Sequence, residues 1–305
     1  MKRLIIKFKH LLVIFFILSS CVVKAQTVQR IFTFEKGDEF KKQSFLNSTF
    51  IIQRGSQQLD ISSSSAVDKT YKITDVNDNT YKFVITIPKM DVEINSIGQK
   101  LVYDSEKQID TTSKIVNALK YIVGKACTVL VDRKGEILSD NDSFAKLAND
   151  TLLSFAGIQA ESFNKGSQFA LIPQFVLANK TLKRGYTWTD TSSYKDQKLK
   201  TKFWVDTLTA ENTVVKFKSS ITGNAINSNT TGTYVLDNKS GVLIQTLVQS
   251  ISTGYMVYNN AVYAITRRIS LSESCIKKGL KTTYITPDMS IPPVFANKSI
   301  PRPNN

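Results

Sequence analysis

Two runs of alternating apolar and polar residues, joined by three turn formers, constrain the fold of this chain most strongly. They lie within residues 70–87, where TYKITDV and TYKFVITI flank NDN. An apolar residue at every second position is the period of a β-strand with one buried face, so the stretch predicts an antiparallel hairpin. Residues 202–221 repeat the order strand, short turn, strand. The chain is therefore expected to be mainly antiparallel β-structure.

The first 25 residues have the pattern of a secretory signal peptide. Basic residues precede the apolar run LLVIFFIL at 11–18, which is too short to span a bilayer as a helix. Two processing signals overlap after it: VKA at 23–25 fits cleavage after Ala25, whereas LSSC at 18–21 resembles a bacterial lipobox that would lipidate Cys21. We favour cleavage after Ala25, because apolar residues follow Cys21. Either route predicts an exported protein, periplasmic, outer-membrane associated or extracellular, and a lipid anchor would add membrane association.

The charge of the chain is strongly basic. The formal net charge is +15, and it is +10 without the five basic residues of the segment 1–25. Nucleic-acid binding would favour basic residues clustered in a stripe with aromatic residues between them. Here Lys and Arg occur one or two at a time along strands and turns, which favours solvated outer strand faces. We expect no nucleic-acid partner, and the sequence gives no indication of the oligomeric state.

Histidine and cysteine usage limits the available chemistry. The only histidine, His10, lies in the signal segment, so the exported chain has no histidine for catalytic triads, general bases or histidine-containing metal sites. Beyond Cys21, the chain has Cys127 and Cys275, which form no CxxC pair. They either pair as a disulfide across a long loop or pack separately as buried thiols. We expect no catalytic residue, cofactor or metal site, and therefore no enzyme.

The pattern along the chain divides it into five segments. After the signal peptide (1–25) come a first β-rich half (26–109), a helical middle with a short hairpin (110–180), a second β-rich half (181–285) and a Pro-rich tail (286–305). Helical spacing predicts amphipathic helices near 111–123 and 142–156, the first capped by Thr111 or Thr112. The fold class is mainly β (α+β). The two hairpins predict two antiparallel curved sheets or half-barrels and suggest an internal duplication.

Several short motifs together resemble a known family. They are KGD at 36–38, YDS at 103–105, a helix stop at Gly124 before VDRKG at 131–135, GxxW at 185–188 and DNKSG at 237–241. This layout resembles an uncharacterised family of bacterial cell-envelope proteins, a domain of unknown function. Tyr186 departs from the acidic residue expected after the Gly of GxxW. The resemblance implies a secreted or lipid-anchored β-rich protein, without a known activity.

Three classes of function remain to be compared. A carboxylate glycosidase would need a facing acid pair, for which Asp104 beside Ser105 and Glu106, or Asp190 with Asp206, are candidates. All of these acids lie in turns or on polar strand faces, where acids are ordinary. Curved antiparallel sheets with helices on one face often enclose an apolar pocket, so we favour a binding module for a lipid, another amphiphile or an envelope component. The alternative is a structural or protein-interaction role in the envelope.

Overall fold

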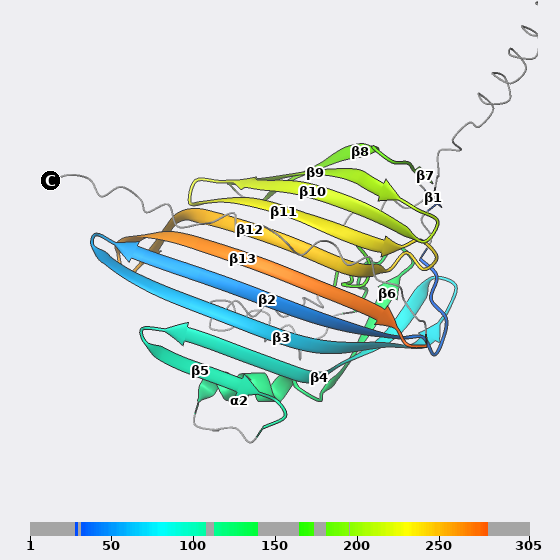
Figure 1. Ribbon diagram of the computed structural model, residues 1–305, viewed down its shortest axis with the longest axis horizontal. Helices are drawn as coiled ribbons and strands as arrows, with labels where there is room; N and C mark the ends of the chain where they lie inside the picture. The colour runs from blue at the N-terminus through cyan, green and yellow to red at the C-terminus, as the bar shows by residue number, and fades with distance from the viewer. Residues whose placement is uncertain are drawn as a thin grey trace, which may run out of the picture.

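The computed structural model describes residues 28–29, 32–107, 113–139, 165–173, 181–194 and 196–279. Eleven strands form one open antiparallel sheet with the order β5-β4-β3-β2-β13-β12-β11-β10-β9-β8, and β6 pairs with β4 (Figure 1). A separate two-stranded sheet joins β1 (Val28–Gln29) to β7 (Thr181–Leu182). The strands of the large sheet are β2 (Glu39–Arg54), β3 (Gln57–Val76), β4 (Thr80–Ser96), β5 (Gln99–Asp104), β6 (Ala126–Asp132), β8 (Thr187–Tyr194), β9 (Gln197–Leu208), β10 (Asn212–Thr222), β11 (Ile226–Asp237), β12 (Leu243–Tyr258) and β13 (Ala261–Lys277).

The two β-rich halves lie in one large sheet, not in the two sheets or half-barrels that we expected. The last strand, β13, pairs antiparallel with the early strand β2, from Ala264 opposite Gln53 to Lys277 opposite Phe40. A period of two indicates that a strand exists and which residues share a face, but it does not indicate the partner strand. The prediction of mainly antiparallel β-structure is confirmed, whereas the duplication into two sheets is not.

The hairpins are where the sequence pattern placed them. Between β3 and β4, the Asn77 side-chain oxygen accepts hydrogen bonds from the backbone N–H groups of Asn79 (3.1 Å) and Thr80 (2.7 Å), a turn that Asn favours. Strands β9 and β10 form the second hairpin. The polar segment 53–68 mostly belongs to β3.

The first predicted helix is present and shorter than expected. Helix α2 spans Lys114–Ile122, and its N-cap is Ser113, whose hydroxyl accepts from the Val116 N–H at 3.4 Å, instead of Thr111 or Thr112. After the helix, Gly124 has a φ of 79°, a conformation that favours glycine. The second predicted helix, near 142–156, lies outside the described residues. No helix in the described ranges is long and apolar enough to cross a membrane.

One end of the sheet has a densely packed core, which we call the packed end. Helix α2 buries Val116, Leu119 and Ile122 in the same apolar cluster as residues of β3, β4 and β6. Phe169, from the segment 165–173, reaches the same cluster, with its ring centroid 4.4 Å from that of Phe83. The side of the sheet that these elements cover is called the covered face below, and the other side is the outer face.

Candidate functional site

Hydroxyl side chains form a band across the covered face of the middle strands. Cross-strand register places Thr201 opposite Ser219, Ser219 opposite Thr230 and Thr230 opposite Ser250. Further along the sheet, Ser48 of β2 lies opposite Ser63 of β3. We call this set the hydroxyl band: Ser48, Ser63, Thr201, Ser219, Ser228, Thr230, Ser250 and Ser252.

Most of the hydroxyl band is internally hydrogen-bonded. Oxygen to oxygen distances are 2.8 Å for Thr201 and Ser219, 2.8 Å for Thr230 and Ser250, and 3.0 Å for Ser252 and Ser228. Ser48 differs from these residues: it is only 5% exposed, and its hydroxyl has no hydrogen-bond partner among the residues that the structure describes. Leaving a buried polar group unpaired costs about 1–3 kcal/mol, so this hydroxyl is a group that a bound molecule would satisfy.

A buried ion pair lies on the same face, between the hydroxyl band and the packed end. Lys42 Nζ lies 3.0 Å from Glu273 Oε1, with the two side chains 6% and 14% exposed. The Ser44 hydroxyl donates to the same carboxylate oxygen at 3.0 Å. Burial raises the pKa of Tyr234 to about 12, and the negative charge of Glu273 adds to the effect. The middle of the covered face therefore carries fixed charges as well as hydroxyl groups.

Aromatic rings run beside one half of the hydroxyl band. Successive ring centroids of Tyr186, Trp188, Phe203, Phe217 and Tyr234 lie 5.7, 5.0, 5.9 and 4.8 Å apart. We call these five residues the aromatic row. A Cβ atom at Gly232 would lie 2.4 Å from the Phe217 ring, so glycine lets that ring cover the backbone of β11. Phe203 and Thr201 are two residues apart on β9, about 7 Å, so an apolar surface and a hydroxyl surface lie side by side.

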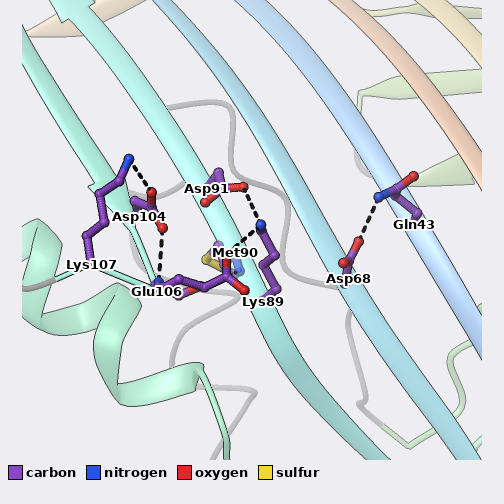
Figure 2. Close-up of polar contacts among 9 residues, drawn as sticks. Gln43, Asp68, Lys89, Met90, Asp91, Asp104, Glu106 and Lys107 are labelled. Atoms are coloured by element: carbon purple, nitrogen blue, oxygen red, sulfur yellow. Dashed lines mark hydrogen bonds and ion pairs between the residues drawn. The ribbon is translucent and has the colours of Figure 1, made fainter.

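The first carboxylate candidate belongs to an ion-pair network on β4 and β5 (Figure 2). Register places Asp104 opposite Asp91, which the sequence had not indicated. Lys107 Nζ lies 2.7 Å from Asp104, and Lys89 Nζ lies 2.7 Å from Glu106 and 3.9 Å from Asp91. The Ser105 hydroxyl accepts from the Met90 N–H at 2.9 Å.

The pKa values of the two facing carboxyl groups shift in opposite directions. Burial, with smaller contributions from Asp104 and Glu106, raises the pKa of Asp91, while Lys89 opposes the rise. A hydrogen bond from Lys107 and one from the Glu106 N–H lower the pKa of Asp104. Figure 2 shows Lys107 beside Asp104 and Lys89 beside Asp91, on either side of the two acids. These contacts connect β4 to the turn that follows β5. Holding the turn against the strand is a sufficient structural role for Asp91, Asp104 and Glu106.

The second carboxylate candidate is not a pair. Asp190 lies opposite Thr201 of the hydroxyl band, on the covered face. Asp206 forms an ion pair with Lys216 at 3.1 Å, and Lys216 lies opposite Trp204 on the outer face. The sheet separates the two carboxylates. In the described part of the chain, no group of three His, Cys, Asp or Glu residues is arranged to hold a metal ion.

The two cysteines are separate buried thiols in this structure. Cys127 lies in β6 and Cys275 in β13, both are 2% exposed, and no disulfide joins them. By strand order they are four strand spacings apart along the sheet, about 19 Å, whereas disulfide Cα atoms lie within about 7 Å. Burial raises the pKa of Cys127 to about 11. Cys21 lies outside the described residues.

Sequence reasoning missed the hydroxyl band and the Lys42–Glu273 pair. The available signal was the alternation itself, since Ser44 and Ser48 occupy the same positions of the β2 pattern as buried Leu46. Polar residues at inward positions of a strand mark a face that is not a uniform apolar core. The partners Lys42 and Glu273 are too far apart in sequence to be connected without the register.

Residues 78–243 match the model of a protein family described as "Family of unknown function (DUF6263)". The chain belongs to this family. The DUF6263 match runs from the β3–β4 turn to the first residue of β12, and it confirms the resemblance to an uncharacterised domain family. No curated protein matches the chain.

Solved structures share only broad features with this member of DUF6263. A structure titled "Lipid-protein interactions in lipovitellin" has a TM-score of 0.47 and 11% identity, covering 83% of this chain and 27% of its own. OccK7 (OpdD) of Pseudomonas aeruginosa has a TM-score of 0.28 and 5% identity, covering 79% of this chain and 100% of its own. The chain thus spans about a quarter of the lipovitellin chain. Both TM-scores are below 0.5, so neither likeness carries a functional argument.

Proposed function

We propose that this protein is a non-enzymatic binding module of the cell envelope, which holds an amphiphile against the covered face of its sheet. The observation that carries the proposal is the buried Ser48 hydroxyl of the hydroxyl band, which has no partner within the described part of the chain. An apolar core that exists only for stability gains nothing from such a group. A ligand with polar groups would pair with it.

The neighbouring surfaces fit a molecule with two chemically different parts. The aromatic row offers rings to an apolar portion, and the hydroxyl band beside it offers donors and acceptors to a polar portion. Ligand sites combine mostly apolar walls with a few placed polar groups in this way. The Lys42–Glu273 pair supplies both signs of charge on the same face.

Native mass spectrometry of protein purified from its own envelope tests the proposal. We expect a bound mass that is released by denaturation and extracts into organic solvent. In S48V, where two methyl groups take the place of the hydroxyl, we expect the occupied fraction to fall at least about fivefold, which corresponds to about 1 kcal/mol. The matched control is T49V, the next residue on β2, whose side chain lies on the outer face.

Two results would contradict the proposal. The proposal would lose its basis if protein purified from its own envelope carried no extractable molecule. Equal occupancy in S48V and T49V would show that the molecule binds elsewhere. Circular dichroism of both variants establishes that a lost mass does not reflect a lost fold.

A protein-interaction role is the second candidate, and one surface favours it. The tip of the β12–β13 hairpin exposes four large apolar side chains: Tyr255 (62%), Val257 (71%), Tyr258 (61%) and Val262 (58%). Its turn residues Asn259 and Asn260 have φ values of 47° and 57°, typical of a tight two-residue hairpin turn. An envelope protein that cross-links to this tip, and whose capture is lost in Y255S/V257S, would support this role instead.

The absence of enzymatic activity needs its own test, because Asp91 and Asp104 face each other. We expect no turnover in a screen of glycoside, ester and peptide substrates, and no tightly bound transition metal after dialysis. Turnover that disappears in D104N would make the protein a carboxylate hydrolase. Because the proposed ligand face lies on the other side of the sheet, such a result would leave the amphiphile measurement standing.

We also propose export, from the segment 1–25 alone. If cleavage follows Ala25, Edman sequencing of the mature protein starts at Gln26, or is blocked by its cyclisation. Labelling with a palmitate analogue that is lost in C21S would instead place the protein on a membrane as a lipoprotein.

A further inference from the structure

A hollow of about 530 Å³ opens on the outer face of β8–β10, away from the proposed amphiphile face. We call it the lysine groove. Its three lysines lie on the other side of the sheet from the hydroxyl band. Ser219 belongs to both surfaces, and its hydroxyl is bonded to Thr201 on the covered face. The residues that line it are Gly185, Thr187, Lys200, Lys202, Trp204, Lys218, Ser219 and Ser220.

The lysines of the groove are close together and not neutralised. Lys202 of β9 and Lys218 of β10 are direct cross-strand partners, and Lys200 lies two residues along β9, about 7 Å away. Within the described residues none of these three forms an ion pair, whereas Lys216, in the next row, pairs with Asp206 at 3.1 Å. Like charges directly opposite in a sheet are destabilising. The three lysines therefore give the groove a positive charge, and their mutual repulsion destabilises the folded sheet.

Trp204 gives the groove an apolar surface. Its cross-strand partners are Thr187 and Lys216, so the indole lies in the row next to Lys202 and Lys218. The side chain is half-buried in mid-strand and does not protrude from an edge or a loop. A flat ring lying on this indole would bring its substituents close to the ammonium groups.

We propose that the lysine groove binds an acidic polysaccharide, with one sugar ring on Trp204 and its carboxylate or phosphate groups on the three lysines. Spaced ammonium groups suit a polymer that carries one anion per unit, since Lys acts as a point charge. A bilayer surface is disfavoured because the indole is recessed, whereas interfacial aromatic residues protrude. Single-stranded nucleic acid is disfavoured because it stacks on several aromatic residues, and the groove has one.

Calorimetric titration with polygalacturonate oligomers tests this inference, using the fully methyl-esterified oligomer as a neutral control of the same backbone. We expect binding to the acid only, weakening with salt. In K200S/K202S/K218S the affinity should fall at least about tenfold. The matched variant K41S/K72S/K82S removes three exposed lysines from the outer face of β2–β4, and its affinity should fall less than about threefold.

The indole is tested separately. W204A should weaken oligomer binding, while F45A, which removes an exposed aromatic ring from the outer face of β2, should not. Equal losses in the two triple-lysine variants would overturn the inference, because net charge alone would then explain binding. Failure of the acid oligomer to bind would overturn it, as would tighter binding of single-stranded DNA or phosphatidylglycerol vesicles through the same lysines. None of these outcomes bears on the amphiphile mass, so the two proposals fail separately.

Discussion

The packed end and the middle strands occupy the same face of the same sheet, yet they bury opposite chemistry. At the packed end Tyr71, Ile73 and Phe83 are fully buried among apolar neighbours and covered by α2. In the middle strands Ser48, Ser63 and the Lys42–Glu273 pair are buried beside apolar residues such as Leu46. The alternation of the strands is the same in both regions. We infer from this comparison that the packed end stabilises the fold. The middle strands bury polar groups at positions where apolar side chains would stabilise the fold more.

The largest expected effect is at the packed end. Phe83→Ala removes a fully buried ring that contacts Phe34 and Phe169, so we expect a loss of about 3–5 kcal/mol in the free energy of unfolding. Urea denaturation measures it. A loss below about 1 kcal/mol would mean that this end is not a tight core.

Breaking the ion pair of the middle strands should come next. Lys42→Met leaves Glu273 buried without its cation and should cost about 3 kcal/mol, while K42M/E273L should recover most of the loss. Equal instability of the single and double variants would show that the pair does not act as a unit. The same denaturation experiment decides between them.

The third prediction concerns how the free energy of unfolding changes at alkaline pH because of Tyr234. Burial raises the pKa of Tyr234 from 10.0 to about 12, so the folded state keeps a proton that the unfolded state releases. Its contribution is complete below pH 10 and is lost as the pH rises from 10 to 12. Tyr234→Phe should therefore lose less stability across that window than the unchanged protein. Tyr255→Phe, at an exposed tyrosine, should behave like the unchanged protein.

The smallest effect is expected in the hydroxyl band. Ser48→Ala removes a buried hydroxyl that has no partner in the described ranges, so ligand-free protein should be unchanged or more stable by up to about 1 kcal/mol. A clear loss of stability would indicate that the Ser48 hydroxyl has a structural partner. Thr49→Ala, on the outer face, serves as the control in thermal denaturation.

Much of the fold follows from local patterns. The two hairpins and the helix that ends before Gly124 are each encoded within a few residues, which is why the sequence predicted them. The single sheet depends on the pairing of β13 with β2, and no local pattern specifies that pairing. The fold class was therefore predictable, and the sheet topology was not.

The candidate surfaces depend almost entirely on register. Lys202 and Lys218 appear scattered along the chain, and only the β9–β10 pairing sets them side by side. The sequence interpretation placed such lysines on solvated outer faces, but it could not show that they gather next to Trp204. Likewise, the facing of Asp91 and Asp104 arises from the β4–β5 pairing.

Photolabelling tests the role of the middle strands most directly. Protein loaded with amphiphiles extracted from its own envelope, each carrying a diazirine group, would be irradiated, digested and mapped by mass spectrometry. We expect labels at covered-face positions of β2, β3, β11 and β12, among them Ser48, Ser63, Ser228 and Ser250, with S48V reducing the yield. Labels confined to outer-face positions such as Phe45 and Thr49, or to the hairpin tip at Tyr255 and Val257, would contradict the proposal.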